Sequence, residues 1–155
     1  MDDVGIGAPV SVDANVPAER RIRVSAAVIT DDSGRLLLVR KRGTTAFMQP
    51  GGKPDPGETA AQTLVRELDE EIGIRPPASA ITSLGTFTAP AANEPGHLVV
   101  ADVFRVEIGA AVPVIAAEIA ESRWVTRADA DEIEIAPLAL AYFLPEVTTR
   151  PAGSP

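Results

Sequence analysis

Residues 52–74 read GKPDPGETAAQTLVRELDEEIGI, and this stretch decides the fold because a shaped loop leads directly into an amphipathic helix. Residues 50–57 combine three prolines with three glycines. Proline lacks a backbone donor and fixes φ, whereas glycine adopts conformations that other residues avoid, so this segment cannot form regular structure. It predicts a loop of defined shape in front of the helix.

The helix is predicted to begin near Ala60. Thr59 lies three residues before Gln62, an arrangement typical of a capping box, in which each side chain bonds the other residue's backbone N–H. Apolar residues then recur at three- and four-residue spacing: Leu64, Val65, Leu68 and Ile72. This face should pack on a core, and Gly73 should end the helix in a left-handed conformation.

Three glutamates stand at i, i+3 and i+4 on the same helix: Glu67, Glu70 and Glu71. We expect their carboxylates to converge on the side turned away from the core. Their repulsion costs an isolated helix about 0.2–0.5 kcal/mol per pair, so a bound cation would relieve a penalty. Oxygen ligands suit Mg²⁺, which keeps positions for water and substrate phosphates. The alternative is a solvated acidic face, offset in part by Arg66.

Taken together, the loop and helix resemble the signature of the Nudix hydrolases, the MutT-like nucleoside diphosphate-X pyrophosphohydrolases. Five residues separate Gly52 from Glu58, and seven more separate Glu58 from Arg66. Arg66 opens the run RELDEEIGI over residues 66–74, and every fixed position of the signature is filled. The match is specific, because so many constrained positions at fixed spacing rarely coincide by chance.

The resemblance implies roles for individual residues. The implied metal ligands are Gly52, through its carbonyl, Glu67, Glu70 and Glu71, with Mg²⁺ as the cofactor and Mn²⁺ as a substitute. Glu58 and Arg66 would brace the loop against the helix through charge-assisted hydrogen bonds.

The resemblance also implies an α/β fold, the Nudix α/β/α sandwich, in which a mixed sheet carries helices on its faces. The implied reaction is Mg²⁺-dependent hydrolysis of a phosphoanhydride bond in a nucleoside diphosphate-X compound. An unmodified or oxidised nucleoside triphosphate is the first expected substrate. The expected products are a nucleoside monophosphate and inorganic diphosphate.

Two other functions remain open. An ADP-ribose or nucleotide-sugar pyrophosphatase is the first, because Pro90 lies at a distance from the motif that resembles enzymes acting on ADP-ribose. The second is a catalytically inactive, nucleotide-binding regulatory module. The complete set of signature residues weighs against an inactive module, since the loss of one of them would be the expected mark of a dead site.

Several residues outside the helix are candidates for substrate contacts: Arg40, Lys41 and Arg42 after a predicted strand, Phe47, Lys53 in the motif loop, and Glu94 in the loop over residues 89–96. Each also has a structural interpretation. The basic residues could solvate a strand end or the loop, and Phe47 could be a core aromatic rather than a platform for a base.

The segment over residues 118–125 resembles the acidic segment and tryptophan-containing strand that follow in this family. A glutamate there would complete the metal site or position the water, with Glu118 as the first candidate and Glu121 as the second. Either Glu70 or Glu118 would accept the water's proton.

The flanking sequence predicts a mixed arrangement of strands and short helices. Residues 23–30 and 36–39 are expected to form a hairpin around a turn at 31–34. The continuous apolar run over 36–39 indicates burial on both faces, with the motif helix as one cover. The remaining expected elements are strands over 81–88, 97–106 and 118–125, a short helix from residue 129, and an apolar helix over 138–144.

The chain has 155 residues and a mass of 16.2 kDa, which suits one domain, expected over residues 20–148 between a flexible arm (1–19) and a frayed tail (149–155). Its net charge of −8 argues against a nucleic-acid polymer as a partner and leaves a small nucleotide as the expected one. With no cysteine, no secretory signal pattern and no membrane-length apolar run, a cytoplasmic protein is expected. The apolar strands would allow a homodimer.

Overall fold

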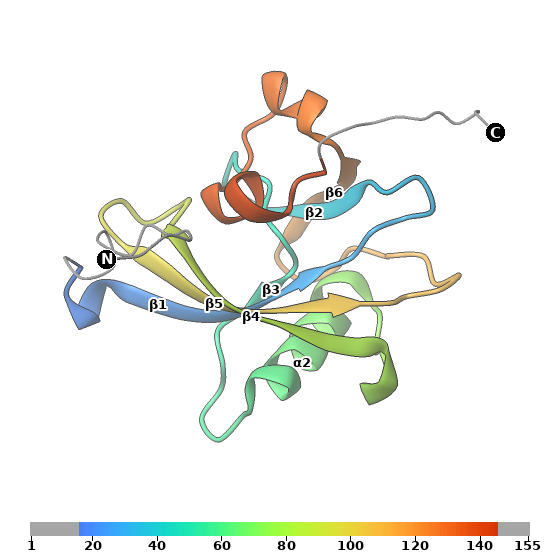
Figure 1. The fold of residues 1–155 in the computed structure, drawn as a ribbon, viewed down its shortest axis with the longest axis horizontal. Helices are drawn as coiled ribbons and strands as arrows, with labels where there is room; N and C mark the ends of the chain where they lie inside the picture. The colour runs from blue at the N-terminus through green and yellow to red at the C-terminus, as the bar shows by residue number, and fades with distance from the viewer. Residues whose placement is uncertain (1–15, 146–155) are drawn as a thin grey trace, which may run out of the picture.

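The structure is a computed structural model that describes residues 16–145 (Figure 1). A four-stranded sheet has the order β3-β1-β5-β4. Its strands are β1 (Arg21–Val28), β3 (Gly51–Gly52), β4 (Ile81–Pro90) and β5 (Leu98–Val106). β1 runs parallel to β5, whereas the other two pairs are antiparallel, so the sheet is mixed as expected.

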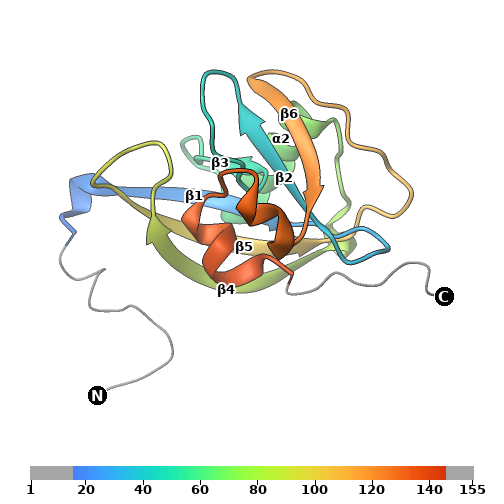
Figure 2. The same ribbon diagram turned by 90° about the horizontal axis from the view of Figure 1, so that it is seen from above.

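A second, two-stranded sheet pairs β2 (Leu36–Lys41) with β6 (Ile119–Val125), and Figure 2 shows these strands side by side. The predicted hairpin is therefore present only around its turn. Leu37 N–H donates to the Ile29 carbonyl at 2.9 Å and a bridge joins Thr30 to Leu36, but β2 then pairs with β6 instead of β1. Because β2 is apolar on both faces, it leaves the edge of β1 and lies where both faces can be covered.

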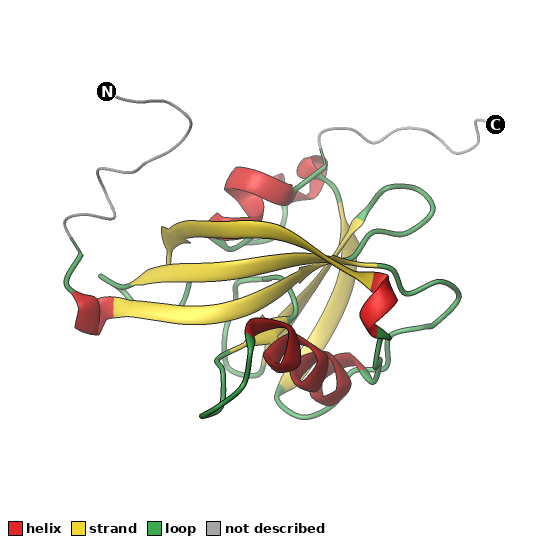
Figure 3. Cartoon of the chain, turned by 60° about the horizontal axis from the view of Figure 1, so that its bottom comes forward, coloured by secondary structure: helices red, strands yellow, loops and turns green. Residues whose placement is uncertain are grey.

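Helical segments lie on opposite sides of the sheets (Figures 1 and 3). One side carries α2 (Ala60–Ile72), and the other carries η3 (Arg127–Asp131) and the π-helical turn η4 (Ala139–Phe143). Two further short turns are η1 (Ala18–Arg20) and η2 (Ala78–Ala80). The expected α/β architecture with helices on both faces of the strands is confirmed.

The alternating side chains of β2 enter two separate cores. Leu37 packs in the cluster that contains Leu68 of α2, whereas Leu38 packs in the cluster that contains Leu138 of the C-terminal segment. The predicted burial of β2 on both faces, with the motif helix as one cover, is confirmed.

The helix α2 begins and ends at the residues that the local sequence predicts. Gln62 N–H donates to Thr59 Oγ1 at 3.1 Å, and Thr59 N–H donates to Gln62 Oε1 at 2.9 Å, which completes the predicted capping box. Gly73 ends the helix at φ 70°, in the left-handed region. Leu64, Leu68 and Ile72 are fully buried, and Val65 is half-buried.

Most of the expected arm over residues 1–19 and all of the expected tail over 149–155 lie outside the described residues. Between residues 16 and 145, no helix has the length and apolar character needed to cross a bilayer.

We expect Leu68→Ala to lower the free energy of unfolding by about 2–5 kcal/mol, because it leaves a cavity between α2 and β2. Leu140→Ala, the same truncation at a side chain that is 39% exposed, should cost less than about 1 kcal/mol. Urea unfolding of both variants measures the difference, and equal losses would contradict the packing described.

Candidate active site

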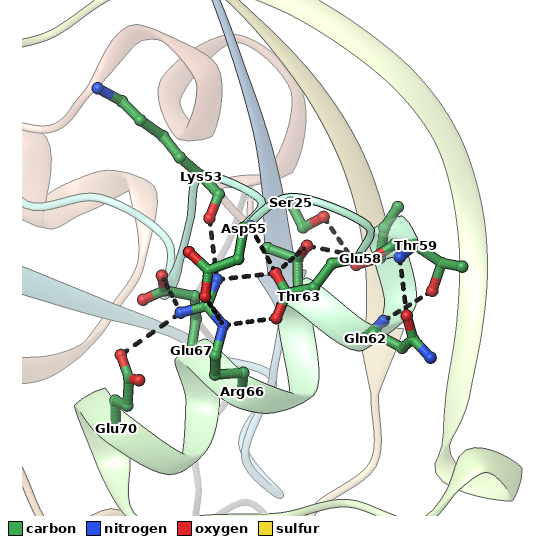
Figure 4. A network of polar contacts seen from close by, with 11 residues as sticks. Ser25, Lys53, Asp55, Glu58, Thr59, Gln62, Thr63, Arg66, Glu67 and Glu70 are labelled. Carbon is green, nitrogen blue, oxygen red and sulfur yellow. Dashed lines mark hydrogen bonds and ion pairs between the residues drawn. The ribbon is translucent and has the colours of Figure 1, made fainter.

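Arg66 fastens the motif loop to α2 (Figure 4). Its Nε and Nη2 donate to the two carboxylate oxygens of Glu58 at 2.6 and 2.9 Å, and Nη2 also donates to the Lys53 carbonyl at 3.0 Å. A bidentate, charge-assisted contact of this kind is strong and directional. The hydrogen bonds from Arg66, together with the one from the Asp55 N–H, lower the pKa of Glu58 to about 2. The predicted brace between loop and helix is present.

The third guanidinium nitrogen of Arg66 faces the acidic helix surface. Nη1 donates to Glu67 Oε2 at 2.9 Å and lies 3.6 Å from Glu70 Oε1. Glu67 is largely buried, and burial raises its pKa, whereas the side chain of Glu70 is 52% exposed. The two carboxylates therefore share one cation but differ in their surroundings.

Glu71 is only 2% exposed, so the expectation that it lies on the side turned away from the core is wrong. It follows Leu68 by three residues and Leu64 by seven, and the helical period therefore puts it on the apolar face. Gly51 N–H donates to its Oε1 at 3.1 Å, while its buried Oε2 has no hydrogen-bond partner among the described residues. Burial raises the pKa of Glu71 to about 8.

The glycine pair of β3 has no room for side chains. A Cβ at Gly51 would run into the Ser25 carbonyl, and φ at Gly51 is 152°. A Cβ at Gly52 would lie 2.5 Å from the carboxylate of Glu67. The backbone of the pair can therefore lie against β1 on one side and against the α2 carboxylates on the other.

A cavity of about 430 Å³ lies along β1 beside this pair. Ser25 of β1 is opposite Gly52, and Ile22 is opposite Val99 of β5, so the cavity extends from the glycine pair toward the start of β1. Apolar side chains from β1, β5 and the C-terminal segment line much of it: Ile22, Val24, Val99, Leu138 and Ala139.

Five of the predicted site residues line this cavity: Gly52, Lys53, Glu67, Glu94 and Glu118. Pro90 and Lys41 line it as well. Glu58, Arg66, Glu70 and Glu71 do not, although Glu71 lies directly behind Gly51. The structure thus brings the loop, α2 and the residue before β6 to one end of the cavity.

Phe47 is a core aromatic, as its structural interpretation predicted, and its candidate role as a substrate contact is wrong. Its side chain is 4% exposed, belongs to the core cluster of Leu38, and does not line the cavity, so it cannot serve as a stacking platform for a base there. The guanidinium groups of Arg40 and Arg123 lie 5.9 and 5.5 Å from its ring centroid. Its sequence neighbours could not show this, because the cover comes from β2 and β6.

Arg40 and Arg42 also lie away from the cavity. Arg40 Nη1 donates to the Thr44 carbonyl at 2.8 Å and Nη2 to Glu121 at 3.4 Å, and Arg42 is exposed. Neither is placed to contact a phosphate inside the cavity. Lys41 is the member of the basic cluster that lines it.

The structure separates the two glutamates near β6. Glu118 lines the cavity and lies 3.5 Å from Lys41 Nζ, and its charge contributes to the raised pKa of Glu71. Glu121 is paired with Arg123 and Arg40 on the two-stranded sheet, and these contacts lower its pKa. Glu118 is therefore the better-placed candidate.

Three polar residues of the cavity lining were not predicted from the sequence: Ser25, Gln49 and Asp55. The sequence gives one signal for Gln49, a polar residue between Met48 and the Pro50-Gly51 turn. The structure shows that this glutamine is only 6% exposed. Nothing in the local pattern of β1 distinguishes Ser25.

Residues 16–145 contain no preformed cluster of three or more His, Cys, Asp or Glu side chains suited to a metal. Glu67 and Glu70 turn toward Arg66 instead. Two features nevertheless fit a hard divalent cation, namely the unpartnered Oε2 of Glu71 and the bare Cα of Gly52 against the Glu67 carboxylate. The donor set is entirely oxygen, as Mg²⁺ prefers.

We expect Arg66→Lys to loosen the motif loop, since an ammonium group cannot form the two-pronged contact with Glu58. Amide hydrogen exchange over residues 53–58 should become about tenfold faster. Arg75→Lys, at an arginine that is 67% exposed and paired with Asp69, is the matched control and should leave the loop unchanged. Equal exchange in both variants would argue against the brace.

Glu71→Gln should stabilise the protein at alkaline pH when divalent ions are removed with EDTA. Because the pKa of Glu71 is raised from 4.5 to about 8, the wild-type protein loses stability as the pH rises through this window, and the uncharged amide of the variant avoids that loss. The variant's advantage should grow by an amount on the order of 4 kcal/mol between pH 4.5 and 8. Urea unfolding at pH 5 and 8.5 measures it, and a pH-independent difference would contradict the burial of a carboxylate.

Comparison with known proteins agrees with this geometry. The family model described as NUDIX domain matches residues 19–147. An 8-oxo-dGTP diphosphatase of Haemophilus influenzae is 46% identical over 57 residues, which are 34% of this chain and 42% of that protein. An ADP-ribose pyrophosphatase of Methanocaldococcus jannaschii is 30% identical over 74 residues, 46% of this chain and 43% of that protein. The matches thus span less than half the length of these curated relatives.

Among solved structures, the MutT protein of Methanosarcina mazei is similar over 83% of this chain and 89% of its own, with 27% identity and a TM-score of 0.61. The family match covers most of the sequence, and the loop, the helix and the glycine pair have the geometry just described. The chain belongs to the Nudix hydrolase family.

Proposed function

We propose that this protein hydrolyses a phosphoanhydride bond in a nucleoside diphosphate-X compound, with an unmodified or oxidised nucleoside triphosphate as the first candidate substrate. For a nucleoside triphosphate, the products would be a nucleoside monophosphate and inorganic diphosphate. The observation that carries the proposal is the position of Glu67 and Glu71 at the glycine pair, where buried carboxylates with raised pKa values meet the end of a nucleotide-sized cavity. The names of the similar curated proteins support it.

The residues that would hold Mg²⁺, or Mn²⁺ in its place, are Glu67, Glu70, Glu71 and the carbonyl of Gly52. When bound, the ion neutralises phosphate charge and lowers the pKa of a coordinated water. The carboxylate of Glu71 is held for this role by the Gly51 N–H, which fixes one oxygen and leaves the other without a partner.

The remaining groups act on the substrate and on the proton. Lys53 and Lys41 both line the cavity and supply positive charge for the substrate's phosphates. Glu118 lines the cavity too, whereas Glu70 does not, so we assign proton acceptance from the attacking water to Glu118. Arg66 has no contact with substrate in this scheme and keeps the loop in register with the helix.

A second candidate is hydrolysis of ADP-ribose or a nucleotide sugar. Pro90 lines the cavity, and one of the similar curated proteins is named an ADP-ribose pyrophosphatase. An inactive binding module has less support, because all the signature residues are present.

Product analysis tests the proposal. The purified protein is incubated with and without Mg²⁺ against nucleoside triphosphates, 8-oxo-dGTP, ADP-ribose and nucleotide sugars, and the products are separated by ion-exchange chromatography. Mg²⁺-dependent release of a nucleoside monophosphate from one class would support the reaction and choose between the first two candidates. Binding without turnover of any compound would favour the inactive module.

Glu71→Gln should retain the fold and lower kcat by about 10²–10⁴-fold, since the amide removes a negative ligand while keeping an acceptor for the Gly51 N–H. Glu132→Gln removes an exposed carboxylate outside the site and should leave kcat unchanged. Circular dichroism confirms folding of both variants. Full Mg²⁺-dependent activity of Glu71→Gln would show that the ligand assignment is wrong.

A further inference from the structure

Gln49 is a buried amide on the wall of the cavity. Its side chain is 6% exposed, and its Nε2 donates to the Ala27 carbonyl at 3.1 Å. A carbonyl oxygen can only accept, so this contact determines the orientation of the amide and makes Oε1 the free end. Oε1 is buried and has no hydrogen-bond partner among the described residues. A buried acceptor without a donor is costly to a folded protein and calls for an explanation.

Besides Gln49, the polar side chains that line the cavity include acceptors as well as the donors of Asn93, Lys41 and Lys53. The hydroxyl of Ser25 donates its proton to the Ala60 carbonyl at 2.8 Å, so its oxygen can only accept a further hydrogen bond (Figure 4). Glu94 contributes a carboxylate to the cavity lining. The lysines that line the cavity are Lys41 and Lys53, and Lys53 belongs to the motif loop beside the glycine pair.

We propose that Gln49 Oε1 accepts a hydrogen bond from an exocyclic amino group on the base of the substrate. The protein would then select adenine-, cytosine- or guanine-type bases, and it would discriminate against uracil, thymine and hypoxanthine. This inference rests on the proposed function, because it names the class of base that the same site accepts. It assigns Gln49 to specificity and gives it no part in the chemical step.

The placement of Gln49 suits this role. It directly precedes Pro50, whose carbonyl accepts from the Ala27 N–H, so Gln49 lies beside β1 next to the glycine pair. Gln49, Val24, Leu138 and Lys53 line the same cavity, so a base held there can approach the amide while its phosphates lie at Lys53. Oε1 is covered by the surrounding protein, and half-buried Met48 on the same wall can adapt through its flexible thioether side chain to admit a base. A base that presents a carbonyl oxygen instead of an amino group at this position would put acceptor against acceptor.

The test compares kcat/KM for nucleotides that differ in one amino group: CTP with UTP, ATP with ITP, and GTP with ITP. In each pair that contains a substrate, kcat/KM of the wild-type protein should be about tenfold or more higher for the nucleotide with the amino group. Gln49→Met keeps the length of the side chain and removes the acceptor. It should lower kcat/KM for the amino-bearing nucleotide by about 10–100-fold and leave its partner within about threefold. Gln62→Met, the same substitution at an exposed helix cap, should preserve the wild-type ratio.

Binding of the monophosphates AMP, IMP, CMP, UMP and GMP, measured by calorimetry, separates the two hypotheses. Discrimination for the amino group without turnover of any triphosphate would overturn the proposed function and support the role of Gln49. Turnover of both members of every pair at similar kcat/KM would support hydrolysis and overturn the role of Gln49, whether or not Gln49→Met folds. An unchanged preference in folded Gln49→Met would overturn it as well.

Discussion

The contact between the Arg66 guanidinium and the Glu58 carboxylate is the constraint on which the site depends. It ties a loop without regular structure to the first turns of α2 through two hydrogen bonds of 2.6 and 2.9 Å. The same guanidinium bonds the carbonyl of Lys53, the residue after the glycine pair. Because Gly51 and Gly52 also pair with β1, this one cation holds the sheet, the loop and the helix in register. Any ligand that binds at the glycine pair therefore meets preorganised groups.

The apolar run of β2 organises the layers around that site. Its side chains are almost fully buried on both faces, so α2 must cover one side and the C-terminal segment the other. This requirement removes β2 from the larger sheet and leaves one face of β1 open beside η4, where the cavity lies. The distribution of apolar side chains in one strand thus leaves room for the cavity.

The burial of the acidic residues Glu67 and Glu71 lowers the stability of the fold at the proposed site. Glu71 lies against the core with an unpartnered oxygen, and burial of both Glu67 and Glu71 raises their pKa values. In a chain with a net charge of −8, such groups are costly unless a cation accompanies them. Arg66 and Lys41 supply part of that charge. The arrangement fits the divalent ion of the proposed function.

Local sequence determined the ends of α2, its apolar face and the motif loop, because caps, glycines and i, i+4 spacing act over a few residues. The Glu58–Arg66 brace was predicted from the resemblance to the Nudix signature. Local sequence also indicated the burial of β2. The helical period also places Glu71 on the apolar face, because it follows Leu68 by three residues and Leu64 by seven. The burial of Phe47, the separation of β2 from β1 and the place of Gln49 in the cavity were decided only by tertiary structure. Each depends on contacts with segments distant in sequence: Phe47 on β2 and β6, Gln49 on β1, and β2 on two helical layers. Short-range patterns specify what a segment prefers, whereas burial is a property of how all the segments pack together.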